Sequence, residues 1–227
     1  QPEEIAACLT ETFLIEPPHP LINAFLQFNK VPTTILVNPC INYNGRPLLH
    51  YTCTHKYDIA RKAIFEQFPD QKDSIDANGN TFLHRACLTN NVYSIEDSFK
   101  MFGNNANAKN SNGDTPLHFL MYNPSHDFEN NFKMLIDNKA DIKMVNNKNQ
   151  NIFHILAEHN NHESCKILLS NDLIKKEDID FLLSQRDADK RTPIEVASIQ
   201  RVGTNQGLYE DVGSTEVRNT PEISSWS

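Results

Sequence analysis

Apolar and polar residues alternate along this chain in blocks of nearly constant length. Each block opens with polar, turn-forming residues, continues with a short apolar run and ends in a segment whose apolar residues recur at i, i+3 and i+4. That spacing is typical of helices that bury one side. The pattern therefore predicts successive pairs of helices, and the second helix of a pair is clearest over residues 59–65, 128–136 and 164–169.

A hexad marks the start of each block. Its clearest copy is Gly113–His118, with the sequence Gly-Asp-Thr-Pro-Leu-His. The last residues of the copies lie at positions 50, 84, 118, 154 and 195, so the steps are 34, 34, 36 and 41. The other copies are Gly45–His50, Gly79–His84, Asn149–His154 and Lys190–Glu195.

The hexad resembles the Thr-Pro-Leu-His core of the ankyrin repeat, whose period is about 33 residues. Gly103–Asn110 and Ala140–Asn146 stand where ankyrin repeats usually close, which extends the resemblance to residues 42–199. The resemblance implies an all-α solenoid of about five helix-turn-helix repeats with short β-turn tips. It also implies that Thr115 and Thr192 cap first helices that begin at Pro116 and Pro193.

The turn before each first helix has its own chemistry. A short polar side chain that can bond its own backbone lies three residues before each hexad. The first hexad position requires positive φ, which glycine adopts freely and asparagine tolerates, so Lys190 fits this position worst. The polar residues are Asn42, Asp76, Asn110, Asn146 and Asp187.

Three regions follow from this division of the chain. We expect residues 1–41 to form an N-terminal helical cap or degenerate repeat, 42–202 the ankyrin-repeat domain and 203–227 a flexible acidic tail. Two insertions interrupt the period, at residues 122–127 and 173–185, and the second is expected to hold an extra helical turn or two.

Composition narrows the function classes. The formal net charge of −8 and the lack of a basic stripe argue against nucleic acid and anionic membranes as partners. No apolar run approaches the roughly 20 residues of a membrane span. The five cysteines suggest reduced packing residues, so we expect a cytoplasmic protein. We also expect a monomer. Because the chain opens on Gln1 rather than Met, we also expect a processed or excised chain.

Histidine and cysteine positions suggest metal or nucleophilic chemistry, but structural roles explain them better. The hexad histidines occur once per repeat, too far apart to share one ion, and the resemblance implies that they brace the turns. His159, His162 and Cys165 have a tighter spacing, but the register separates them. We predict no catalytic residue, no metal site and no cofactor.

A protein partner is the remaining expectation. The resemblance places partner contacts in a concave groove lined by the turn tips and first helices, and Tyr and Arg there are the best anchors. The predicted partner-binding residues are Tyr43, Arg46, His55, Asn78, Asn80, Leu88, Asn112, Asp114, Tyr122, Lys148 and His159.

Alternative settings stay open for such a binding module. The diverged repeats and the hydroxyl-rich, acidic tail resemble effectors that intracellular bacteria deliver through a type IV secretion system, which would place the protein in a host cytosol. An ordinary cytosolic adaptor and a substrate-recruiting segment of a larger enzyme are the other two interpretations.

Overall fold

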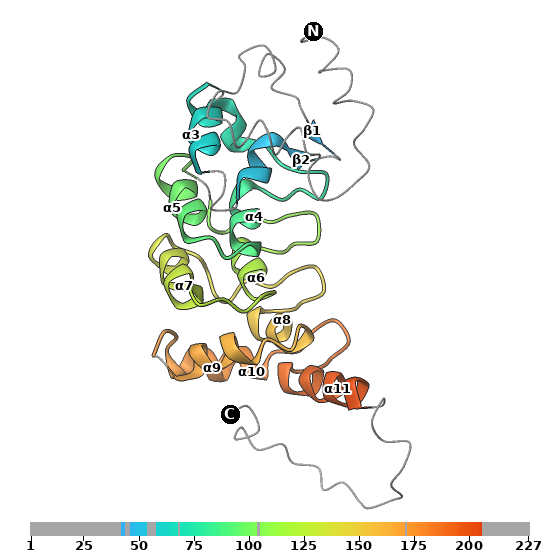
Figure 1. The fold of residues 1–227 in the computed structure, drawn as a ribbon. Helices are drawn as coiled ribbons and strands as arrows, with labels where there is room; N and C mark the ends of the chain where they lie inside the picture. Colours follow the sequence, from blue (N-terminus) through green and yellow to red (C-terminus); the bar gives the residue numbers. More distant parts are fainter. Residues whose placement is uncertain are drawn as a thin grey trace, which may run out of the picture.

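The protein is a stack of short helices in this computed structural model (Figure 1). The structure describes residues 42–43, 46–53, 58–67, 69–103, 105–170 and 172–205. The predicted cap over residues 1–41 lies outside this part of the chain, and so do residues 206–227 of the predicted tail.

Helices in two parallel rows make up the stack. The first row holds the helix that follows each hexad turn. The second row holds the second helix of each repeat and lies to the left of the first row in Figure 1. The first row consists of the 3₁₀ helix η1 (Leu48–Thr52), α4 (Phe82–Leu88), α6 (Pro116–Leu120), α8 (Ile152–Glu158) and α11 (Pro193–Asn205). The second row consists of α3 (Asp58–Gln67), α5 (Val92–Lys100), α7 (Phe128–Asp137) and α9 (His162–Ser170).

Strands are almost absent from the described residues. Within them, β1 (Asn42–Tyr43) and β2 (Arg46–Pro47) form one antiparallel pair, in which Tyr43 lies opposite Arg46. A short 3₁₀ helix, η3 (Pro69–Asp73), follows α3. The predicted all-α repeat stack is confirmed.

Local sequence signals place the helix starts correctly. α6 begins at Pro116 after Thr115, and α11 begins at Pro193, where the missing N–H of proline leaves no helical bond unmade. The insertion at 173–185 contains helix α10 (Lys176–Ser184), as predicted. Residues 203–205, at the start of the predicted tail, are the last residues of α11.

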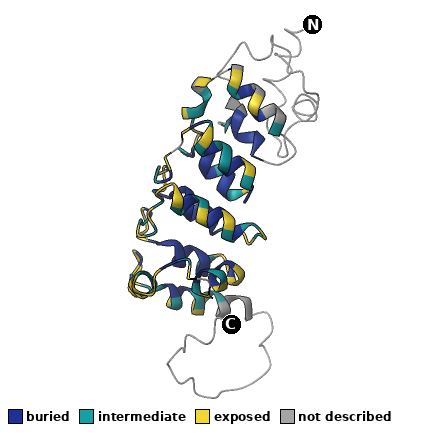
Figure 2. Cartoon of the chain, turned by 90° about the vertical axis from the view of Figure 1, so that its left-hand side faces the viewer, coloured by how far each residue is buried: buried dark blue, intermediate teal, exposed yellow. Residues whose placement is uncertain are grey.

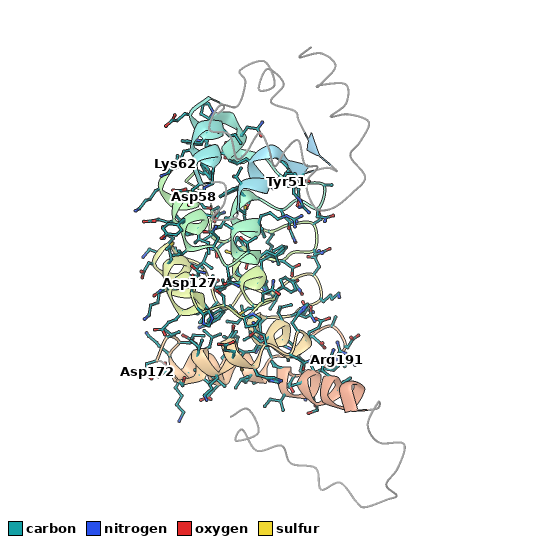
Figure 3. All side chains as sticks on the ribbon, viewed as in Figure 1. Tyr51, Asp58, Lys62, Asp127, Asp172 and Arg191 are labelled. Carbon is teal, nitrogen blue, oxygen red and sulfur yellow. The ribbon has the colours of Figure 1, made fainter. Side chains whose placement is uncertain are left out.

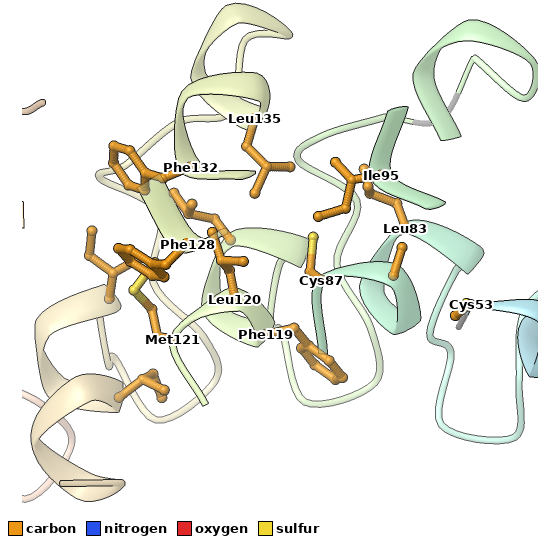
Figure 4. Close-up of a cluster of buried hydrophobic side chains, with 14 of the residues drawn as sticks. Cys53, Leu83, Cys87, Ile95, Phe119, Leu120, Met121, Phe128, Phe132 and Leu135 are labelled. Carbon is orange, nitrogen blue, oxygen red and sulfur yellow. The ribbon is translucent and has the colours of Figure 1, made fainter. Parts of the chain in front are cut away.

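The core runs through the interface between the two rows and from one repeat to the next. Leu83 and Cys87 of α4 gather with Ile95 of α5, and apolar side chains of α6 and α7 continue the cluster (Figure 4). The Phe102 ring packs against rings of two helices: its centroid lies 4.8 Å from that of Phe65 in α3 and 4.9 Å from that of Phe82 in α4. Figure 2 shows the buried residues along the middle of the stack. The core is thus continuous from one repeat to the next.

Three of the five cysteines lie in the described residues, and all three are core residues. Cys53, Cys87 and Cys165 are buried and free. Burial raises the pKa of the Cys53 thiol to about 12, and that of Cys165 also to about 12. Such thiols stay protonated, which agrees with the predicted packing role.

Candidate functional site

The turn tips are built by the short polar side chain that precedes each hexad. Asn110 Oδ1 accepts from the backbone N–H groups of Asn112 and Asp114, both at 2.9 Å, and Asp76 Oδ1 does the same for Asn78 and Asn80. The predicted turn chemistry is confirmed at these positions. It closes each tip independently of any partner.

Positive φ occurs at the first hexad position in four repeats. The values are +74° at Gly79, +76° at Gly113, +56° at Asn149 and +64° at Lys190. Lys190 therefore adopts the turn that its residue type disfavours. Arg191 offsets this cost, because its N–H and guanidinium both donate to Asp187 in the same turn.

Backbone hydrogen bonds join each tip to the next. Ser111 N donates to Asn78 O at 2.9 Å, Asn147 N to Asn112 O at 2.9 Å and Ala188 N to Lys148 O at 2.8 Å. The side chains of Asn78, Asn112 and Lys148 are exposed. These three predicted residues thus occupy equivalent places on one continuous row.

Asn80 and Asp114 correct the predicted set. They are only 2% and 3% exposed, so the prediction that their side chains face a partner is wrong. Asn80 Oδ1 accepts from Asn110 Nδ2 at 2.8 Å, and Asp114 Oδ1 accepts from Asn146 Nδ2 at 2.9 Å. The second hexad position points toward the neighbouring tip and joins the tips, because an unpaired polar group there would be costly. The recurrence of polar residues at this position was the sequence signal for that role.

The hexad histidines brace successive repeats. His84 Nδ1 accepts from the Thr81 backbone N–H at 3.1 Å, while its Nε2–H donates to Asp114 O of the next repeat at 3.0 Å. His118 makes the same pair of bonds with Thr115 and Gln150, both at 3.1 Å. One nitrogen accepts and the other donates, so each ring is neutral. Burial lowers the pKa of His84 to about 4.

An aromatic chain connects this brace to the surface. The ring centroids of His84 and Phe119 are 5.2 Å apart, those of Phe119 and Tyr122 5.3 Å, and those of Tyr122 and His159 4.4 Å, all edge to face. Each such edge-to-face pair stabilises the fold by about 0.5–1.5 kcal/mol beyond the contribution of the buried apolar area. Tyr122 is half-buried and His159 exposed, so the chain ends at the surface.

Residues 93–180 match the family model of ankyrin repeats, in 3 copies. Over these residues the chain is similar to ankyrin repeats, and the stack of helix pairs is consistent with an ankyrin-repeat array. No curated protein matches the chain. Ankyrin repeats are protein-protein interaction modules in general and typically non-catalytic, which makes the surface of the array its candidate functional site.

We call one surface of the stack the tip face. It comprises the exposed tip residues Asn78, Asn112 and Lys148 and the outward residues of the first helices. Those helix residues recur four positions after the hexad's last residue, as Leu88, Tyr122 and Glu158, each partly exposed. In Figure 1 the tips project away from the second-row helices.

The remaining predicted residues belong to the first repeat of the stack. Arg46 in β2 carries its guanidinium carbon 5.0 Å from the centroid of the Tyr51 ring. Tyr43 lies in β1, where the structure describes the strand. His55 lies outside the described residues. All three stay predictions as partner contacts.

The described part of the chain contains neither a metal-binding cluster nor a membrane-spanning helix. No group of three or more His, Cys, Asp or Glu side chains there could hold a metal ion. Cys165 is buried, whereas His159 and His162 are exposed, so this spaced trio does not converge. None of the helices in this part of the chain is long and apolar enough to cross a membrane.

Proposed function

We propose that the tip face binds a partner protein and that it is the concave groove predicted from the sequence. The observation that carries this proposal is the exposed end of the aromatic chain at Tyr122 and His159. It lies beside a tip row whose backbone is held by hydrogen bonds from repeat to repeat. A surface that is already ordered loses little conformational entropy on binding.

The anchors of this interface are Tyr122 and Arg46. Tyrosine and arginine are enriched among interface hot spots, because they combine a large contact area with a polar group. Tyr122 is held by Phe119 and His159, and Arg46 by the Tyr51 ring. Both side chains are therefore positioned before a partner arrives.

Alanine substitutions on two opposite surfaces test the proposal. A partner is first captured from cytosol, and its affinity is then measured by calorimetry. Tyr122→Ala, Arg46→Ala and His159→Ala should each weaken binding by about 1–3 kcal/mol without unfolding the protein.

Matched controls lie on the second-row helices. Lys62 and Lys133 are exposed there, and Figure 3 shows Lys62 on the side of the stack opposite Arg191. Lys62→Ala and Lys133→Ala should leave affinity unchanged. Equal losses on both surfaces, or losses at the lysines alone, would reject the tip face and direct attention to the insertions at 122–127 and 173–185.

A role as a bacterial effector is the finer part of this proposal. Its support is the hydroxyl-rich, acidic composition of residues 203–227. Deleting residues 206–227 should abolish export from a bacterial donor with a type IV secretion system, while the ankyrin array keeps its unfolding midpoint. Normal export of the shortened chain would favour a cytosolic adaptor instead. A catalytic domain in the parent gene would favour the substrate-recruiting segment.

A further inference from the structure

One column of the tip face differs in chemistry from repeat to repeat. The column consists of the residues four positions after the last residue of each hexad. In successive repeats these are Leu88, Tyr122, Glu158 and Ile199. Tyr122 is the aromatic member of this column and carries the edge-to-face contact to His159, 4.4 Å away. The column therefore passes from an apolar side chain through an aromatic pair to a carboxylate.

Besides burial, two carboxylates, those of Asp114 and Glu158, act on Tyr122 and raise its pKa. Neither Asp114 nor Glu158 makes an ion pair within the described residues: Asp114 accepts from Asn146 Nδ2, and Glu158 accepts from Gln150 Nε2 at 2.9 Å. Burial and these two carboxylates raise the pKa of Tyr122 to about 12. The tyrosine stays neutral, and the field around its ring is negative.

Two arginines of the flanking tips are engaged by acids of their own. Arg191 is engaged by Asp187 and Asp189, each at 2.7 Å. On the other side, Arg85 is paired with Asp76. Arg85 and Arg191 are thus both paired with acids of their own repeats.

A positively charged side chain complements such a place. The faces of aromatic rings attract cations, and a carboxylate close by adds a charge-assisted hydrogen bond. Guanidinium fits best, because its plane stacks on a ring while its N–H groups reach the carboxylate.

We propose that this part of the tip face receives an arginine side chain of the partner, which stacks against Tyr122 and His159 and donates to Glu158. The inference rests on the proposed function and names the chemistry that the partner must present. The partner is accordingly a polypeptide with an exposed arginine in the segment that lies along the first-row helices.

A short peptide tests this on the full chain. The protein is titrated with acetyl-Ala-Arg-Ala-amide, and aromatic ¹³C–¹H NMR signals are followed. Saturable shifts should appear at Tyr122 and His159. Replacing arginine by its neutral isostere citrulline should weaken binding about tenfold, as expected for loss of a cation-π contact with a charged hydrogen bond.

Matched variants separate charge from folding. Glu158→Gln keeps an oxygen that can accept from Gln150, but it removes the negative charge. It should therefore weaken binding of the arginine peptide about tenfold. Glu163→Gln changes an exposed acid at the start of α9 and should have no effect. No saturable shift, shifts elsewhere on the protein, or equal binding of the citrulline or a lysine peptide would overturn the inference.

A random-peptide display selection distinguishes this inference from the proposed function. Peptides whose binding is lost in Tyr122→Ala should be enriched in arginine. Binders that depend on Tyr122 but lack this enrichment would overturn the arginine assignment and leave the tip face intact. A selection without any Tyr122-dependent binder would count against both.

Discussion

Arg61 in α3 donates through Nε and Nη2 to the same oxygen of Asp97 in α5, at 2.8 and 2.7 Å. The arginine side chain is 0% exposed, and its remaining donors reach Thr52 O and Asp58 Oδ1. This ion pair connects the second-row helices of the first two repeats. Because the charge is buried, its partners are required rather than optional.

Replacing Asp97 by Ala should therefore be strongly destabilising. It leaves the buried guanidinium with one carboxylate, Asp58, which is itself partly exposed. We expect a loss of about 3–5 kcal/mol in the free energy of unfolding, measured by urea denaturation. The neighbouring surface pair gives the control: Glu96→Gln removes an exposed contact to Lys100 and should cost less than about 0.5 kcal/mol. Similar effects of the two substitutions would contradict the importance of the buried pair.

Gly113→Val should destabilise the array more than Gly103→Val. Both glycines have positive φ, +76° and +62°, so valine is strained at either by about 1–3 kcal/mol. A Cβ at Gly113 would also lie 2.8 Å from Asn147 N, whereas one at Gly103 meets nothing within 4 Å. Thermal unfolding of both variants measures the difference. Equal midpoints would mean that close contact between tips has no energetic weight.

Acid should unfold the array through its buried histidines. The pKa of His84 falls from 6.5 to about 4 on folding, chiefly because burial disfavours the charged ring. Its neutral form is required, since protonated Nδ1 could no longer accept from Thr81. The stability tied to this group is complete above pH 6.5 and is lost as pH falls toward 4, by about 3 kcal/mol.

Urea midpoints between pH 7.5 and 4 test this dependence. His84→Gln should reduce the slope of stability against pH, because one linked proton is removed. His126→Gln, in the exposed link between α6 and α7, should leave the slope unchanged. An identical slope in the protein and in His84→Gln would show that other groups govern the acid response.

Pro47→Thr should stabilise the first repeat. His50 Nδ1 is buried without a hydrogen-bond partner, although its Nε2 bonds to Ser74 O at 3.1 Å. Pro47 occupies the position at which Thr81 and Thr115 supply a backbone N–H, and proline has none. Threonine restores this donor, and we expect a net gain of about 1 kcal/mol.

The histidine itself provides the control for that gain. In a His50→Leu background the Nδ1 acceptor is gone, so Pro47→Thr should no longer stabilise the protein. Differential scanning calorimetry of the four variants gives the coupling energy. A gain that persists without His50 would assign the effect to helix capping alone.

The fold could be predicted from the sequence because the repeat is a local code. The hexad spacing, the polar residue ahead of it and the threonine-proline starts each act within a few residues, and they placed α6, α11 and the tips correctly. The inserted helix α10 was also predicted, since its apolar spacing is local. The candidate site was predicted less well: Tyr122, His159, Leu88, Asn78, Asn112 and Lys148 lie at the surface or partly exposed, whereas Asn80 and Asp114 are buried.

What the sequence by itself determined is therefore the repeat, its register and the turn within each unit, because these depend on backbone preferences over short spans. The tertiary structure decided which polar groups face inward. Asn80 bonds to Asn110, Asp114 to Asn146 and Arg61 to Asp97, and each of these pairs joins residues of neighbouring repeats. Whether a polar side chain serves the stack or a partner depends on what the next repeat places against it, and only packing brings those groups together.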